Sequence, residues 1–139
     1  MANNVLAVGE PALTMELITC KETQAIVARL LYPERCCDDG FASAHRAVAA
    51  QLDASAAASV VHDFSRVSSF VGWAQREVLG DARALSQARS FERVAFVCGE
   101  MPTVLTTVNS LLWLSPVKPA RAFASADAAV RWCCGDGVD

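Results

Sequence analysis

The chain has 139 residues, of which 53% are hydrophobic, and its 12 basic and 15 acidic side chains give a formal net charge of −3. This length and this apolar share suit one compact domain over residues 1–139 that builds its own core without a structural metal. The basic residues are scattered singly along the sequence, which argues against nucleic-acid binding by neutralisation of phosphates.

The N-terminal segment and the apolar runs bear on the compartment. Residues 1–15 have no basic residue before their apolar positions, and they carry Glu10 and Pro11, which is not the layout of a signal peptide. The longest apolar runs, such as residues 111–114, are far shorter than the roughly 20 residues that cross a bilayer. We therefore expect a cytoplasmic protein that is not an integral membrane protein.

The six cysteines and two histidines are the candidate disulfide partners and metal ligands of the sequence. Four of the cysteines form the adjacent pairs Cys36-Cys37 and Cys133-Cys134, and neighbours in sequence rarely bridge to each other. In a protein without an export signal this pattern predicts six reduced thiols. The C-x-x-C spacing of a zinc site is missing, and so are the Walker and Rossmann nucleotide-binding motifs, so the sequence predicts neither a metal nor a cofactor.

The N-terminal half predicts a hairpin, a helix and a further strand. Residues 15–20 and 24–31 are apolar segments joined by a short polar link, which predicts two antiparallel strands. Capping carboxylates and apolar residues at spacings of three and four predict a helix over residues 38–52. Residues 59–64 then predict a short buried strand.

The C-terminal half alternates helices with strands. Periodic apolar positions predict helices over residues 68–85 and 102–112, with a strand between them at residues 93–98. Residues 120–124 predict the last strand, and residues 125–132 predict a last helix that begins with a capping serine. The order ββαβαβαβα predicts an α/β fold with a mostly parallel sheet and one antiparallel edge strand.

Three phrases of the sequence resemble the SpoIIAA-like branch of the STAS superfamily, also described as STAS/SEC14-like. Residues 90–99 (SFERVAFVCG) resemble the branch's "FERVAVVG" strand, and residues 119–132 (PARAFASADAAVRW) are similar to its closing strand and helix. Residues 61–67 (VHDFSRV) resemble the "DLSGV" strand end of the wider superfamily. With the order of elements, the resemblance covers about residues 15–134. It implies a SpoIIAA-like, STAS-like fold without a catalytic motif.

One departure from the superfamily concerns its regulatory serine. In phosphorylation-regulated STAS domains a "DSSG" motif follows the strand and its serine accepts phosphate, whereas this chain has Val67-Ser68-Ser69-Phe70 at that place. The aspartate and the glycine of the motif are missing. The departure favours the divergent SpoIIAA-like branch over a kinase-switched domain.

The candidate binding site lies in the loop after residues 59–64, because open parallel sheets bind ligands at the carboxyl ends of their strands. The loop carries the polar residues Asp63, Ser65, Arg66, Ser68 and Ser69. A helix that begins there would present free N–H groups to an anion. The alternative is architectural, with one of the last two serines capping the helix and Asp63 paired with Arg66.

The remaining candidates are a cysteine, a histidine and two tryptophans. Cys98 and His62 form the one pair worth naming for nucleophilic catalysis, but no third group orients them, so we expect no enzyme. Trp113 extends the apolar surface of its predicted helix and is a candidate partner contact. Trp132 is expected to be structural.

Two classes of function therefore remain open. The first is a regulatory or protein-interaction module whose partner is another protein or a second copy of the chain. The second, which the SEC14-like label implies, is a carrier of a small apolar or lipid-like ligand held between helices and sheet.

Overall fold

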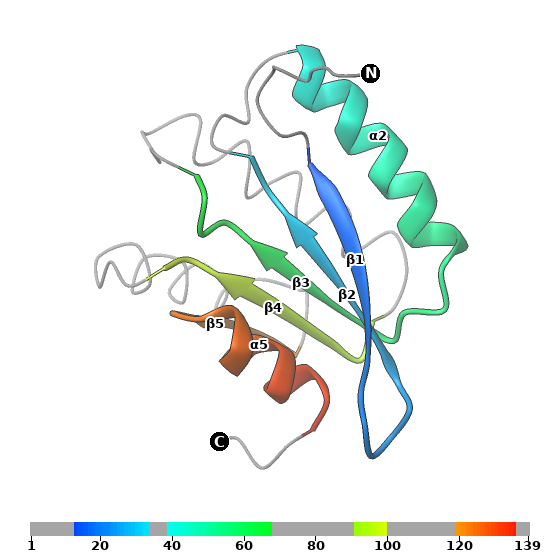
Figure 1. Cartoon of the computed structure of the whole chain (residues 1–139), viewed down its shortest axis with the longest axis vertical. Helices are drawn as coiled ribbons and strands as arrows, with labels where there is room; N and C mark the ends of the chain where they lie inside the picture. Colours follow the sequence, from blue (N-terminus) through cyan, green and yellow to red (C-terminus); the bar gives the residue numbers. More distant parts are fainter. Residues whose placement is uncertain (1–12, 34–38, 68–90, 100–118, 136–139) are drawn as a thin grey trace, which may run out of the picture.

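The computed structural model describes residues 13–33, 39–67, 91–99 and 119–135. They form a five-stranded sheet in the order β1-β2-β3-β4-β5 (Figure 1). The strands are β1 (Thr14–Thr19), β2 (Ile26–Leu31), β3 (Ser59–Asp63), β4 (Arg93–Val97) and β5 (Ala120–Phe123). β1 runs antiparallel to β2, and the other neighbouring pairs are parallel. The predicted mostly parallel sheet with one antiparallel edge strand is confirmed.

The turn that joins β1 to β2 is closed by backbone hydrogen bonds. The N–H of Cys20 donates to the carbonyl of Ala25 at 2.8 Å, and the N–H of Gln24 donates to the carbonyl of Cys20 at 2.9 Å. Gln24 takes the left-handed conformation with φ 62°, and its side-chain amide donates to the carbonyl of Lys21. Cys20 thus lies directly after the last residue of β1, at the start of the turn.

Two helices are described, α2 (Asp39–Ala54) and α5 (Ala126–Cys133). α5 begins as predicted at the N-cap Ser125, whose hydroxyl accepts from the N–H of Ala128 at 3.2 Å. Asp127 in its first turn and Arg131 in its last turn suit the dipole of the helix. The predicted helices over 38–52 and 125–132 are thus confirmed. The helices predicted over 68–85 and 102–112 lie outside the described residues.

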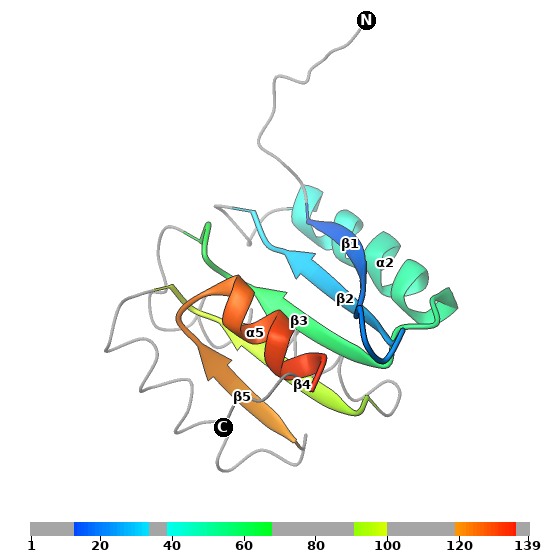
Figure 2. The same ribbon diagram turned by 60° about the horizontal axis from the view of Figure 1, so that its bottom comes forward.

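The two helices lie on opposite faces of the sheet (Figure 2). α2 connects β2 to β3, and its Val48 and Leu52 belong to the core cluster of one face. α5 follows the last strand, so no crossover fixes its side, and its Ala129 and Cys133 belong to the cluster of the other face. Successive side chains of a strand point to opposite faces of the sheet, so alternate residues of the strands belong to the two different clusters.

The face that α2 covers has an aromatic interior around His62. The His62 ring is fully buried, lies 5.1 Å from the Phe96 ring in a stacked arrangement, and hydrogen-bonds through Nδ1 with the Tyr32 hydroxyl at 2.9 Å. Burial, and to a lesser extent the nearby His45, lowers the pKa of His62 to about 3. His62 is therefore a neutral core residue.

The face that α5 covers is held by aliphatic strand residues and by Trp132. Trp132 is half-buried, packs against Phe123 at 5.4 Å between ring centroids, and lies under the guanidinium of Arg93 at 5.1 Å. The same guanidinium donates to the backbone carbonyl of Trp132. These contacts place Trp132 in the packing between α5 and the sheet, with part of its ring left in solvent.

α5 is too narrow to cover its whole face. A helix is roughly 10 Å across with its side chains, and neighbouring strands lie about 4.8 Å apart, so one helix covers two to three strands. α5 packs on β3, β4 and β5. Within the described part of the chain, β1 and β2 are left without a helix on that side.

A disulfide joins Cys20 to Cys134 across 114 residues of sequence, with their Cα atoms 5.5 Å apart. The prediction of six reduced thiols is therefore wrong. It was based on the rarity of bridges between adjacent cysteines, whereas here one member of an adjacent pair bridges to a distant strand. Cys98 and Cys133 are free and buried, and Cys36 and Cys37 lie outside the described residues.

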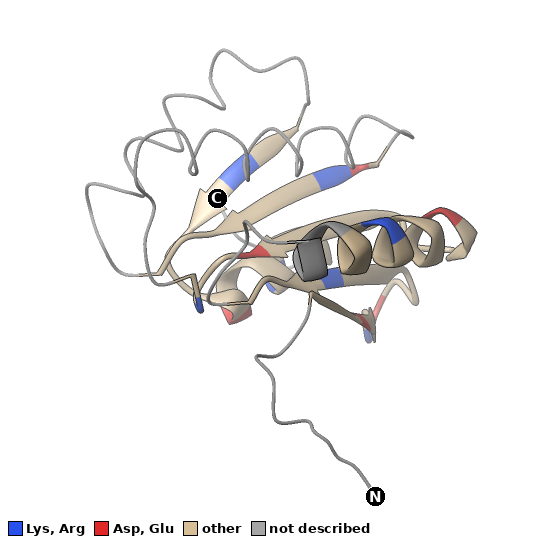
Figure 3. Ribbon diagram, turned by 90° about the horizontal axis from the view of Figure 1, so that it is seen from above, with Lys and Arg blue, Asp and Glu red and all other residues tan. Residues whose placement is uncertain are grey.

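The Lys, Arg, Asp and Glu positions of the described ribbon are distributed over several elements (Figure 3). This arrangement agrees with the scattered basic residues of the sequence. Neither α2 nor α5 has the length and the apolar character that a membrane crossing would need.

Candidate functional site

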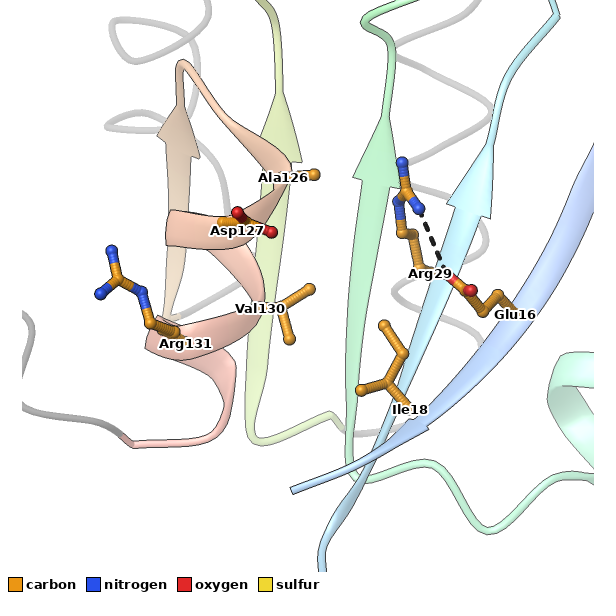
Figure 4. Close-up of a pocket in the computed structure, with 7 residues that line it drawn as sticks. All are labelled: Glu16, Ile18, Arg29, Ala126, Asp127, Val130 and Arg131. Atoms are coloured by element: carbon orange, nitrogen blue, oxygen red, sulfur yellow. Dashed lines mark hydrogen bonds and ion pairs between the residues drawn. The ribbon is translucent and has the colours of Figure 1, made fainter. Parts of the chain in front are cut away.

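A groove with a volume of about 630 Å³ lies between α5 and the strands β1 and β2 (Figure 4). One wall comes from β1 and β2 and the other from α5. The lining residues are Glu16, Ile18, Arg29, Ala126, Asp127, Val130 and Arg131. We call this feature the sheet–α5 groove.

Apolar side chains from both walls line the middle of the sheet–α5 groove. Ile18 from β1 and Val130 from α5 point toward one another, and Ala126 lies further along the same side of the helix (Figure 4). Arg131 extends from the outer side of α5, away from the centre. The groove thus has an aliphatic middle with charged groups around it.

Arg29 carries the charge network of the strand wall. It stands directly opposite Glu16 in the register of β1 and β2, and its Nη1 donates to Glu16 Oε1 at 3.2 Å. Its Nε and Nη2 donate to Asp63 Oδ2 at 3.0 Å and 2.6 Å. The Arg29 side chain is 28% exposed and that of Asp63 is 0% exposed. Arg29 therefore neutralises a carboxylate that has no access to solvent.

Asp63 organises the loop that the sequence singled out. Its Oδ1 accepts from the backbone N–H of Ser65 at 2.9 Å, while its Oδ2 is taken by Arg29. The architectural alternative for this loop paired Asp63 with Arg66, but the ion pair is made with Arg29 from the neighbouring strand. Both carboxylate oxygens are engaged, so Asp63 positions the loop and is not open to a ligand.

The other residues of the predicted site are placed only in part. Ser65 and Arg66 are exposed at the end of β3, where a partner can reach them. Ser68, Ser69 and Trp113 lie outside the described residues, so their proposed roles stay predictions. The described part of the loop reaches the groove indirectly, through the contact between Asp63 and Arg29.

The buried thiols are poor nucleophiles. Burial raises the pKa of Cys98 to about 12, and the nearby Asp63 acts in the same direction. A thiol with such a pKa is protonated at neutral pH. His62, the candidate partner of Cys98 in the sequence, is a buried residue of the aromatic core. Among the described residues, no group of three or more metal-ligating side chains comes together. The groove itself offers charge pairs and aliphatic contacts, which suit binding.

Sequence reasoning missed the groove because it predicted the ligand site at the ends of the strands. The groove depends on which strands α5 covers, and this is a matter of tertiary packing. One signal was present, since Arg29 interrupts the apolar run of β2 (IVARLL). A charged side chain inside such a strand requires a partner or an opening, and Arg29 has both.

Comparison with solved structures finds a similar fold. A protein of the DUF3478 family from Shewanella loihica, described as uncharacterized and as having a SpoIIAA-like fold, aligns with a TM-score of 0.60 and 13% sequence identity. The alignment covers 96% of this chain and 99% of the other. No protein-family model and no curated protein matches the sequence. The predicted SpoIIAA-like fold is thereby confirmed.

Proposed function

We propose that this SpoIIAA-like domain is a non-catalytic, cytoplasmic protein-interaction module that docks a partner segment in the sheet–α5 groove. The observation that carries the proposal is the aliphatic middle of the groove, formed by Ile18 and Val130, with charged side chains around it. Such a lining suits an extended polypeptide segment with an aliphatic side chain as anchor and charged neighbours.

The charges of the groove favour a basic partner segment. The lining residues carry two carboxylates, Glu16 and Asp127, and two guanidiniums, of which that of Arg29 is already paired with Glu16 and with the buried Asp63. Arg131 points away from the middle of the groove (Figure 4). The Glu16 side chain is 59% exposed, so it can pair with a lysine or arginine of a partner. The proposed occupant is therefore a segment with an aliphatic anchor next to a basic residue.

The groove suits a lipid-like ligand less well. An acyl chain binds in a continuous apolar cavity, whereas four of the seven lining residues are charged. The exposed Ser65 and Arg66, with Ser68 and Ser69 after them, form a second candidate contact at the end of β3. Phosphorylation of either of the last two serines would add negative charge to this contact.

The test uses a matched pair of variants on one strand. Ile18 lines the groove, whereas its neighbour Leu17 is 51% exposed and does not line it. Peptides selected from a random display library against the wild-type protein are expected to carry an aliphatic residue beside a lysine or arginine. Ile18→Arg should weaken their binding at least about tenfold, because it removes the anchor contact and adds a like charge. Leu17→Arg should leave binding unchanged.

Other occupants would give different results in the same experiment. Peptides that bind both variants equally would contradict docking in the groove. A lipid-mass adduct in native mass spectrometry that Ile18→Arg removes would identify a carrier instead. A wild-type dimer that only Ile18→Arg dissociates would make a second copy of the chain the occupant.

A further inference from the structure

The Cys20–Cys134 disulfide connects the two walls of the sheet–α5 groove. Cys20 follows the last residue of β1 and lies two residues after Ile18. Cys134 is the C-cap of α5, and its N–H donates to the carbonyl of Val130 at 2.9 Å. The bond thus lies one helical turn from the aliphatic middle of the groove and holds its two walls together at one end.

We propose that this disulfide is a redox-controlled clasp. In the oxidised state it holds the C-terminal turn of α5 against the hairpin, and in the reduced state it lets that end of the groove widen. The clasp would thereby regulate docking in the groove, so its regulatory meaning rests on the proposed function.

The chemistry needs a thiol reductant such as glutathione. Cys134 is half-buried at a helix end beside the exposed Gly135, whereas Cys20 is 3% exposed, so attack falls on the sulfur of Cys134. A glutathione thiolate bonds to that sulfur and displaces the Cys20 thiolate, which takes up a proton. A second glutathione thiolate then attacks the sulfur of the bound glutathione, releasing glutathione disulfide and the Cys134 thiolate, which is protonated. Two electrons pass to the protein disulfide, and two glutathiones are oxidised.

The release is expected to stay local, because other contacts keep α5 on the sheet. Arg93 and Phe123 contact Trp132, and Ala129 is fully buried against the strands. A helix of eight residues has little stability of its own. Without the clasp, its last turn is therefore the part expected to loosen.

Re-oxidation is expected to restore the same pairing. Cys133 is next to Cys134 but is buried in the cluster under α5. Burial raises the pKa of Cys133 to about 12, against the smaller opposite effect of Arg93. Its thiol is therefore protonated at neutral pH and competes poorly in exchange.

The test is made on the full chain, equilibrated in glutathione buffers from oxidising to reducing. Alkylation and intact mass report the disulfide, and hydrogen exchange with mass spectrometry reports the backbone. On reduction, amides 130–135 should exchange at least about tenfold faster while amides 93–97 in β4 keep their rates. Cys20→Ser should show the fast rates in both buffers, whereas Cys133→Ala should respond as the wild type does.

Three results would overturn the clasp. The disulfide could stay oxidised in every glutathione buffer, which would make it a permanent staple. Reduction could leave amides 130–135 unchanged, or it could unfold β4 together with α5. The exchange measurement uses no ligand, so it is independent of docking. Faster exchange of α5 on reduction, together with peptide binding that Ile18→Arg does not weaken, would contradict the proposed function and leave the clasp standing. Unchanged exchange on reduction, together with peptide binding that Ile18→Arg weakens, would contradict the clasp and leave the proposed function standing.

Discussion

The two faces of the sheet are built by the same five strands but carry different kinds of side chain. On the α2 face, the rings of Tyr32, His62, Phe64 and Phe96 pack in a fully buried cluster. On the α5 face, the strands carry Arg29 and Asp63 as well as aliphatic residues, and among the described elements the short helix α5 packs on β3, β4 and β5. The contrast separates a face with a closed aromatic core from the face that carries the proposed binding groove.

The difference also shows how each face handles its titratable groups. His62 is buried without charge, because the aromatic cluster disfavours the imidazolium. Asp63 is equally buried but keeps a cationic partner, Arg29, which reaches solvent and Glu16. Charge is therefore excluded from one face and paired on the other, and each arrangement can be tested by substitution.

The largest effect is expected from Arg29→Met on the α5 face. The substitution leaves the carboxylate of Asp63 buried without its cation, and breaking a buried ion pair on one side costs about 3 kcal/mol. Urea denaturation should show this loss in the free energy of unfolding. Adding Asp63→Asn should restore part of it, because the amide oxygen still accepts from the Ser65 N–H.

The control for this prediction is Arg66→Met, at an exposed arginine that makes no ion pair with Asp63. It should change the unfolding free energy by no more than about 0.5 kcal/mol. If Arg29→Met proved as stable as Arg66→Met, the pairing of charge on the α5 face would not contribute to stability.

A smaller effect, dependent on pH, is expected from His62 on the α2 face. The folded pKa of about 3 is below the unfolded value of 6.5, so the unfolded state binds the extra proton between these values. The stabilising contribution is fully present above pH 6.5 and decreases as the pH falls. At pH 5 the loss should reach about 2 kcal/mol.

The matched control for the pH effect is His62→Gln, which keeps a hydrogen-bonding group but does not titrate. Denaturation curves at pH 7 and pH 5 should give a smaller difference for this variant than for the wild type, by about 2 kcal/mol. An equal change in unfolding free energy between pH 7 and pH 5 in the two proteins would mean that the His62 imidazole is solvated and that water enters the α2 face.

The smallest effect is expected at the hairpin that both faces share. Gln24 has φ 62°, a conformation that costs a residue with a side chain about 1 kcal/mol, so Gln24→Gly should raise stability by about 0.5 kcal/mol after its own entropic cost. Lys21→Gly in the same turn should lower stability, because Lys21 has no positive φ. A loss in both variants would indicate that the side-chain bond of Gln24 outweighs the strain.

The sequence predicted the described strands and helices because their signals are local. Apolar segments, a polar turn and the capping Ser125 are contained in short windows, and β2, β3, β4 and α5 followed them closely. The fold class followed from the order of these elements together with the resemblance. Local patterning was therefore enough for the architecture of the described residues.

The groove and the disulfide could not be predicted in the same way, because both join segments that are far apart in sequence. Cys20 and Cys134 are separated by 114 residues of sequence. Arg29 on β2 pairs with Asp63 on the neighbouring strand β3, 34 residues later in the sequence. The adjacent cysteine pairs predicted free thiols because neighbouring cysteines rarely bridge to each other, but Cys134 bridges to Cys20, which is far away in the sequence. The loop residues Ser68 and Ser69 stay predictions, since they lie outside the described residues.

The central claim, that the α5 face binds a polypeptide segment, is tested most directly by nuclear magnetic resonance. A selected basic and aliphatic peptide would be titrated into the isotope-labelled chain while the backbone amide signals are followed. Docking in the sheet–α5 groove predicts shifts at residues 16–18, 29 and 126–131, with little change over α2. Shifts confined to α2, or spread evenly over the chain, would contradict it.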